Sequence, residues 1–563
     1  MEKNFKKNKN EVKLLFLILI FLVAGFLRFW EVTRIPPGLF GDEVDTGYQA
    51  YSILKTGKDY FGNFLPVHFQ SLGDWRVPLY IYLDTLFVAI FGLTEMAVRL
   101  PAVILGMLSV LAVFFLVQKF TKNKNIALLS AFLLAISPWH FHISRIGLEV
   151  NFLPVLFPLG ILCFWKGLEN KKRFLFILSA IFLGLTPYAY NTSKLFLPLI
   201  LVVLFYLWRK EVLSERKNLM IFLIVLFIVL LPLGKDFLKG TSQARFLGIS
   251  IFNNPQTAEK VRLAREKCDY QGIFERVLHN KVVFWFDDFV KNYLSAISPS
   301  FLFGSGDPNP RHSIGGRGEM YLWELPFLIL GLIFAFWQAI KEKNKFFQFS
   351  LWWLVLAPIP ASLTLNGGTH ALRLFLFLPW LQIFTALGIG EFFNYLKNKK
   401  FKIIFGVALS LVIILSCFNY FHHYFVHYPK ISGRWWNYGY KKVFEYVNKV
   451  ENKYERIYIS PSWEPSTVYS LFYGKFSPYE VQKEITLTVN ALGKYHFYSP
   501  DLGRVKRGEG DLKTLYIVNP AELAIPDLDI KKSPYVRFVK EIKTPDGLIS
   551  FVIFSSADIK ENE

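Results

Sequence analysis

Two adjacent carboxylates, Asp42 and Glu43, are the sharpest chemical feature of this sequence. They follow the turn Pro37-Gly38 and open a stretch in which Tyr48 and Tyr51 lie at helical spacing. A carboxylate at a surface can act as a general base toward a hydroxyl or amine. Acidic side chains also suit the first turn of a helix, where they stabilise exposed N–H groups. Spacing alone leaves a catalytic pair and a helix cap both open.

Histidines and cysteines give weaker signals. His422, His423 and His427 lie in the aromatic segment FHHYFVHYP, which is typical of the belt where a span leaves a membrane. His140 and His142 are two residues apart, with no further ligands at zinc-site spacing. The three cysteines show no pairing pattern, so we expect no disulfide. A divalent ion would have to draw on scattered carboxylates, namely Asp42, Asp74, Asp287 and Asp288.

Composition then indicates what must position these groups. The chain has 563 residues, of which 53% are hydrophobic and 18% aromatic. Apolar runs of about 17 to 25 residues are long enough to cross a bilayer of about 30 Å. The sequence predicts about eleven spans. They lie near residues 14–30, 97–119, 125–142, 150–168, 174–190, 194–209, 217–233, 323–341, 346–363, 373–392 and 401–421.

Positive charge sets the predicted orientation. The net charge of +21 is divided among short clusters between apolar runs, which argues against nucleic-acid binding. Short basic loops alternate along the chain, and such loops remain in the cytoplasm. The basic N-terminal tail precedes a run without a small-residue cleavage site, so we expect a retained first helix. We therefore predict a multi-pass protein of the cell membrane with a cytoplasmic N-terminus and an extracytoplasmic C-terminus.

The long segments fall on the outer side of this arrangement. We predict a membrane domain over residues 1–421, with outer loops 31–96 and 234–322. Residues 422–563 alternate β-rich stretches, such as RIYISPS and TLYIVNP, with an amphipathic stretch around 437–450. This pattern predicts a small extracytoplasmic α/β domain.

Charge is nearly absent from the interiors of the spans. Ion-coupled transporters usually place ionisable groups at mid-membrane, whereas here those groups collect at the outer ends of spans. This distribution favours an enzyme at the outer interface, acting on a substrate with an apolar tail and a polar head. A transporter or flippase of lipid-linked glycans is the alternative, and it would need a polar path through the membrane.

The acidic pair just after the first span resembles the signature of the GT-C glycosyltransferases. Within that superfamily the chain is similar to the protein O-mannosyltransferase and aminoarabinose-transferase group, and to the bacterial RgtA/B/C/D-like family. The resemblance covers roughly residues 14–420, and the tail matches only loosely. The segments that carry it beyond the acidic pair are RVPLYIYLDTLFVAIFG, EMAVRLPAVILGMLSVL, SPWHFHISRIGLEVNF, YAYNTSKLFLPL, GSGDPNPRHSIGG and THALRLFLFLPW.

The resemblance implies a GT-C fold and a hexosyl- or pentosyltransferase. Such an enzyme passes a sugar from a polyprenyl-phosphate donor to an extracytoplasmic protein, lipid or cell-envelope glycan, with inversion. Asp42 would be the base, and Glu43 would orient the acceptor or the loop. The expected partners are the donor, the acceptor and the bilayer, with no nucleic acid. We expect no cofactor and no metal site, although a divalent ion is compatible with GT-C relatives.

A lipid-phosphate leaving group needs cations, which Arg supplies as a fork and Lys as a point charge. Each candidate could instead be a snorkelling anchor at the interface. Arg373 and Lys194 are the preferred donor-phosphate ligands, followed by Arg76, Arg145 and Arg311. The predicted substrate-binding residues are Tyr48, Asp74, His312 and His370.

Overall fold

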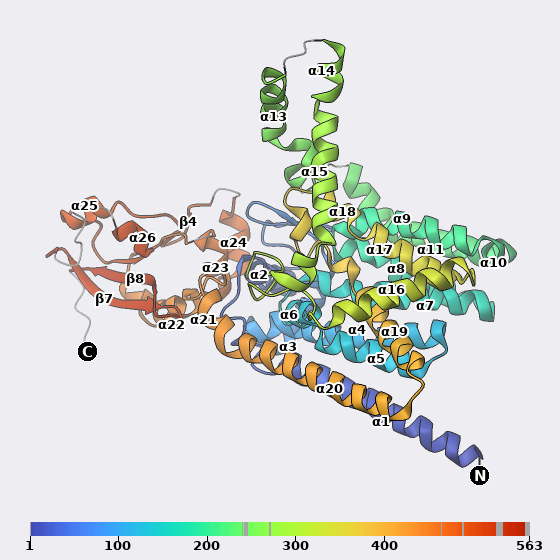
Figure 1. The fold of residues 1–563 in the computed structure, drawn as a ribbon. Coiled ribbons are helices and arrows are strands. Elements are labelled where there is room, and N and C mark those ends of the chain that lie inside the picture. The colour runs from blue at the N-terminus through green and yellow to red at the C-terminus, as the bar shows by residue number, and fades with distance from the viewer. Residues whose placement is uncertain are drawn as a thin grey trace. The chain divides into compact units, whose positions relative to one another are not determined.

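The structure, a computed structural model, describes residues 2–238, 240, 246–268, 272–462, 464–486, 489–524 and 533–557. Its elements form two compact units (Figure 1). The first unit comprises Met1–Trp30, Ala102–Arg145 and Glu149–Tyr420. The second comprises Glu31–Pro101, Ile146–Leu148 and Phe421–Glu563. Each unit therefore combines segments that are far apart in the sequence.

The first unit is mainly helical. Its longer helices are α1 (Glu2–Phe29), most of α4 (Glu95–Thr121), α5 (Lys124–Ile136), α7 (Leu153–Asn170), α8 (Arg173–Ala189), α9 (Thr192–Leu207), α11 (Arg216–Leu238), α13 (Pro255–Glu266), α15 (Lys281–Ala296), α16 (Glu324–Ile340), α17 (Lys345–Leu356), α19 (Trp380–Tyr395) and most of α20 (Lys399–His422). Shorter helices include α6 (Pro138–Ile143), α10 (Arg209–Ser214), α14 (Ile273–Leu278) and α18 (Ile359–Ser362).

Small residues allow close helix packing in this unit. A β-carbon at Gly331 of α16 would lie 1.8 Å from the carbonyl oxygen of Phe384 in α19. One at Gly388 of α19 would lie equally close, 1.8 Å, to the carbonyl oxygen of Phe327 in α16. Close backbone approach at small residues is the usual way in which helices associate in a membrane, where water supplies no hydrophobic drive.

Within the described residues, six helical segments are long and apolar enough to cross a membrane. They are Glu11–Phe29, Glu95–Thr121, Glu149–Asn170, Arg216–Leu238, Phe375–Tyr395 and Lys399–Ser432. Shorter apolar helices are Leu79–Phe91, Lys124–Ile136, Arg173–Ala189, Thr192–Leu207 and Glu324–Ile340. The prediction of a multi-pass helical membrane protein is confirmed, whereas these lengths leave the predicted count of spans undecided.

Several predicted boundaries differ from the structure. The predicted span 125–142 is divided between α5, which ends at Ile136, and α6, which begins at Pro138. The predicted span 373–392 begins before α19, whose first residue is Trp380. The predicted span 346–363 is interrupted, because α17 ends at Leu356 and α18 begins only at Ile359. Pro358 and Pro360 explain the interruption, since proline lacks the amide proton of a helix interior. In addition, the apolar helix α3 (Leu79–Phe91) lies within the predicted outer loop 31–96.

In the described part of the second unit, six strands form a sheet in the order β4-β5-β3-β6-β8-β7. The strands are β3 (Arg456–Ile459), β4 (Ala491–Leu492), β5 (Tyr495–His496), β6 (Thr514–Val518), β7 (Val536–Lys543) and β8 (Ile549–Ser556). β3 runs parallel to β5 and β6, and β8 runs antiparallel to β6 and β7. The helices of this part are α21 (Tyr428–Ser432), α22 (Tyr440–Val450), α23 (Ser466–Tyr473), α24 (Pro478–Glu484), α25 (Leu502–Lys506) and α26 (Pro520–Leu523).

Residues 31–101, which include the predicted outer loop 31–96, fold together with this tail. Their helix α2 (Gly41–Thr56) packs on α23, where a β-carbon at Gly47 would meet the ring of Phe472 at 2.6 Å. The Gly41 amide donates to the Glu464 carboxylate at 2.7 Å. The compact units thus differ from the predicted division at residue 421, because residues 31–101 pack with residues 421–563. Local hydropathy places a segment outside the membrane but does not say what it packs against.

Candidate functional site

Asp42 lies in the first turn of α2 and keeps contact with solvent. Its side chain is 42% exposed, and Arg76 Nη2 donates to its Oδ1 at 2.6 Å. Arg76 belongs to the short ribbon of β1 (Phe69–Gln70) and β2 (Trp75–Arg76). The side chain is thus oriented by a guanidinium while it stays in contact with solvent, which is the arrangement that a general base needs.

Arg76 also binds a second carboxylate. Its Nε donates to Asp45 Oδ2 at 2.5 Å, and the Tyr60 hydroxyl donates to Asp45 Oδ1 at 2.7 Å. Burial raises the pKa of Asp45, while Arg76 and Tyr60 favour its ionised form. Sequence reasoning missed Asp45, although its spacing of three residues from Asp42 places both carboxylates on one helix face.

Glu43 faces the interior. Arg99 donates through Nε and Nη2 to the two carboxylate oxygens, at 2.9 and 3.0 Å, and the Gly147 amide donates to Oε1 at 2.9 Å. Both side chains of this ion pair are 0% exposed. Arg99 also donates to the carbonyls of Val32 and Pro36 at 2.8 and 2.9 Å. Glu43 therefore anchors the segment that carries Asp42 and does not face solvent.

Two other predicted residues of the second unit, Tyr48 and Asp74, form hydrogen bonds within the protein. Tyr48 is buried, and its hydroxyl donates to the Phe476 carbonyl at 3.0 Å. This position favours packing over the predicted substrate contact, because the hydroxyl is used inside the core. Asp74 lies in the turn between β1 and β2 and accepts a hydrogen bond from the Trp75 amide at 2.7 Å.

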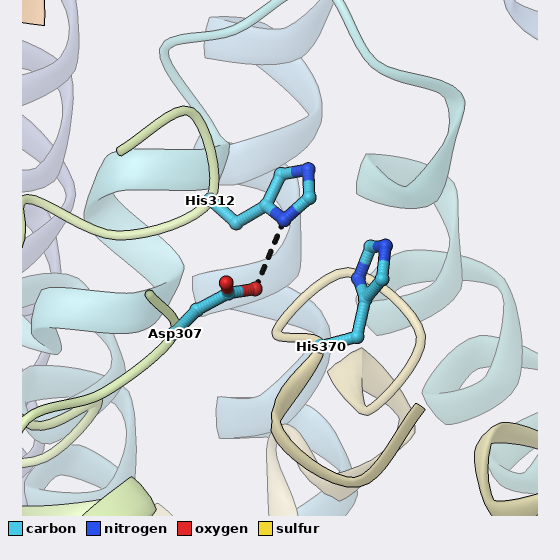
Figure 2. A group of neighbouring side chains, drawn as sticks. All are labelled: Asp307, His312 and His370. Carbon is cyan, nitrogen blue, oxygen red and sulfur yellow. Dashed lines mark hydrogen bonds and ion pairs between the residues drawn. The ribbon is translucent and has the colours of Figure 1, made fainter. Parts of the chain in front are cut away.

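In the first unit, the structure brings Asp307, His312 and His370 together (Figure 2). His312 Nδ1 donates to Asp307 Oδ2 at 2.9 Å. The two imidazole rings stack with their centres 4.4 Å apart. His312 and His370 were predicted as separate substrate contacts, whereas Asp307 was not singled out. Its position five residues before His312, within the segment GSGDPNPRHSIGG, was the available signal.

The predicted cations of the first unit occupy different settings. Arg373 donates from Nη1 to Thr364 Oγ1 at 2.6 Å and to the Leu365 carbonyl at 2.9 Å, and it is half-buried. Lys194 is half-buried in the first turn of α9. The backbone carbonyl of Arg311 accepts a hydrogen bond from His142 Nε2 at 3.1 Å.

Arg145 is buried, which does not favour its predicted role as a donor-phosphate ligand. Its Nη1 donates to the carbonyls of Leu27 and Arg28 at 2.7 and 3.0 Å, at the end of α1. The last carbonyls of a helix have no hydrogen-bond donors within that helix, so the guanidinium acts as their cap. The geometry gives Arg145 a structural function.

Comparisons with known proteins agree with these features. A family profile described as "Dolichyl-phosphate-mannose-protein mannosyltransferase" matches residues 76–233. Two proteins of Bacillus subtilis (strain 168), YycA and YkcB, are each 28% identical, over 207 and 219 residues. Their names class them provisionally as mannosyltransferases. The matches cover 36% and 38% of this chain but only 28% of each relative.

Solved structures extend the likeness over the whole chain. ArnT from Cupriavidus metallidurans, bound to undecaprenyl phosphate, aligns with a TM-score of 0.52 at 11% identity, covering 96% of this chain and 97% of ArnT. The oligosaccharyltransferase AglB from Archaeoglobus fulgidus, in complex with an inhibitory peptide and a dolichol-phosphate, gives a TM-score of 0.50 at 14% identity, covering 96% and 74%. The GT-C resemblance is confirmed. At these identities the structural likeness concerns the fold.

The profile match and the structural site overlap only partly. Residues 76–233 begin at Arg76 and include Arg145 and Lys194. They leave out the acidic residues of α2 and the group around Asp307. The sites therefore rest on the geometry described above.

Proposed function

We propose that this protein is a membrane glycosyltransferase that moves a hexosyl or pentosyl unit from a polyprenyl-phosphate donor to an extracytoplasmic acceptor. The acceptor would be a protein, a lipid or a cell-envelope glycan. The observation that carries the proposal is the solvent-exposed carboxylate of Asp42, held by Arg76 at 2.6 Å on the first helix after α1. The GT-C fold and the lipid phosphates bound by ArnT and AglB support it.

Asp42 would act by removing the proton of the acceptor hydroxyl or amine. The acceptor atom then attacks the anomeric carbon, and the bond from that carbon to the phosphate oxygen breaks with its electron pair on the phosphate. Direct displacement inverts the anomeric centre, so one carboxylate base is sufficient. Arg76 would position this base, since its guanidinium is shared between Asp42 and Asp45.

The leaving phosphate carries negative charge that fixed cations would stabilise. Arg373 and Lys194 stay our candidates, with Arg311 as a further one, because each is only partly buried. Arg145 is set aside from this group because its buried guanidinium caps α1. The outward orientation of these groups and of the C-terminus follows from the charge pattern and belongs to the proposal.

The test is an assay of the purified full-length protein in lipid nanodiscs with a panel of polyprenyl-phosphate sugars. We expect one donor class to release polyprenyl phosphate, and an added acceptor of the correct class to increase that release. Absence of release from every donor, with properly folded protein, would contradict the proposal. Movement of intact donor across proteoliposomes without release would instead support the flippase alternative.

A further inference from the structure

Asp307, His312 and His370 combine a carboxylate and two imidazoles within a small space. One ligand atom from each lies within 4.8 Å of the other two, and within the described residues no other three His, Cys, Asp or Glu side chains meet this condition. We propose that these three residues bind one divalent transition-metal ion, with Zn²⁺ as the best match. This site goes beyond the proposed transfer reaction, does not depend on it, and departs from our sequence-based expectation of no metal.

The donor set selects the class of ion. Imidazole nitrogens suit Zn²⁺ and other late transition metals, whereas Mg²⁺ and Ca²⁺ prefer oxygen ligands. Three protein ligands, with a fourth position left for water or another oxygen ligand, are typical of open zinc sites. Bonds of about 2.0–2.2 Å would bring the ligand atoms to roughly 3.3 Å from one another. The ligand atoms, which lie within 4.8 Å of one another, would therefore have to move closer together on binding.

The Asp307 carboxylate is already oriented. Its Oδ1 accepts a hydrogen bond from the Asn309 amide and its Oδ2 accepts one from the Ala371 amide, both at 2.8 Å. Backbone donors of this kind orient metal-ligating carboxylates in proteins. Because Ala371 directly follows His370, the second bond also joins the loop of Asp307 to the loop that carries the second imidazole.

The loop that carries His370 is closely packed. Asn292 Nδ2 of α15 donates to the carbonyls of Ser362 and Thr364, at 3.1 and 3.0 Å. A β-carbon at Gly367 would lie 1.9 Å from the Ala361 carbonyl oxygen, and one at Gly368 would lie 2.7 Å from that of Asn292. Only glycines permit this approach, so His370 is presented from a fixed backbone.

The two rings stack, and shared metal binding requires them to turn, because an imidazole binds a metal through the lone pair in its ring plane. The planes of His312 and His370 differ by 23°, and Figure 2 shows both rings beside the Asp307 carboxylate. Two stacked imidazoles would repel each other if both were protonated, whereas a metal requires both to be neutral. The competing explanation is a plain hydrogen bond from His312 to Asp307 with a stacked neighbour. The two explanations differ in whether the group binds a metal.

The experiment measures metal binding by the full-length protein, purified without a polyhistidine tag and stripped with a chelator. On titration with Zn²⁺, we expect one ion per chain. His312→Ala and His370→Ala should each weaken binding by more than about 100-fold, since even outer-sphere partners cost about 10- to 100-fold. The matched control is the double variant His422→Ala/His427→Ala, which removes two imidazoles whose rings lie 5.1 Å apart elsewhere in the chain.

Folding is checked by the melting temperature. Zn²⁺ should raise the melting temperature of the wild type and of the control, because an ion that binds only the folded state stabilises it. Zn²⁺ should not change the melting temperatures of His312→Ala and His370→Ala. Loss of binding in the His422 control, or full binding in His312→Ala and His370→Ala, would overturn the proposal.

X-ray absorption of the zinc-loaded wild type gives a result that needs no variant. Two imidazole ligands and oxygen at the metal would support the site, and a zinc spectrum without imidazole would overturn it. These measurements are independent of glycosyl transfer, so a failure of the metal site and a failure of the proposed reaction can be told apart.

Discussion

Asp42 and Asp307 are each fixed by contacts from a second segment of the chain, but their partners have opposite chemistry. Asp42 is paired with the guanidinium of Arg76, whereas Asp307 faces the imidazoles of His312 and His370. A guanidinium stays protonated and cannot bind a metal, while a neutral imidazole can. The side chains are also 42% and 4% exposed, respectively. The partner, more than the carboxylate, therefore separates a candidate base from a candidate metal ligand.

The largest expected effect comes from Asp42→Asn. Asn keeps the shape of Asp but cannot accept the acceptor's proton, so turnover should fall by about 10²- to 10⁴-fold. Release of polyprenyl phosphate is the measurement, and zinc binding at Asp307 should be unchanged. Glu31→Gln is the control and should retain most activity, because this carboxylate lies 3.5 Å from Arg34 and is not among the predicted site residues. Full transfer by Asp42→Asn would leave the acidic residue as a helix cap only.

Next in size is Glu43→Gln, which tests stability. The change leaves the Arg99 guanidinium buried without its counter-charge, and such a loss costs about 3–5 kcal/mol. We expect a clear drop in the unfolding midpoint, together with a smaller loss of turnover per folded molecule than in Asp42→Asn. An unchanged midpoint combined with lost turnover would assign chemistry to Glu43 and remove the contrast between the two neighbours.

A third effect concerns the cationic side chains that are predicted to bind the donor phosphate. Arg373→Ala and Lys194→Ala should each make use of the donor less efficient, because each loses about 2–4 kcal/mol of transition-state stabilisation. Steady-state kinetics with varied donor is the measurement. Arg317→Ala is the matched control, because it removes a guanidinium of the predicted outer loop 234–322 that donates to Asn419 at 3.0 Å. Equal kinetics in all three variants would mean that Arg373 and Lys194 have only structural functions.

The parts of the fold that depend on local sequence pattern could be predicted. Long apolar runs predicted most of the helices, but α3, with 13 residues, was included in the predicted outer loop 31–96. Packing of residues 31–101 with the tail could not be predicted, because hydropathy describes each segment separately. For the same reason Asp42 and Arg76 were found individually, while their contact needs the ribbon β1-β2.

The candidate sites show the same difference between local pattern, which the sequence reveals, and contacts between distant segments, which it does not. Arg99 was not singled out from the sequence, and its burial against Glu43 reveals its function. His312 and His370 were predicted as single contacts, although they are 58 residues apart and meet through two loops. Asp45 is the exception, since the spacing from Asp42 could have indicated it directly. Contacts within one helix are visible in a sequence, and contacts between loops depend on the fold.

The smallest expected effect is that of Tyr48→Phe, and it concerns the contrast between exposed and buried residues of α2. Burial raises the pKa of Tyr48, so its hydroxyl stays protonated and donates to the Phe476 carbonyl at 3.0 Å. Removing one such hydrogen bond costs about 0.5–1.5 kcal/mol of stability. Turnover and acceptor KM should not change, because the ring remains in the core. Tyr51→Phe is the control, with its ring 6.1 Å from that of Tyr48 and partly exposed. A higher KM for the acceptor without a change in the unfolding midpoint would return Tyr48 to the substrate-binding residues, as the sequence first predicted.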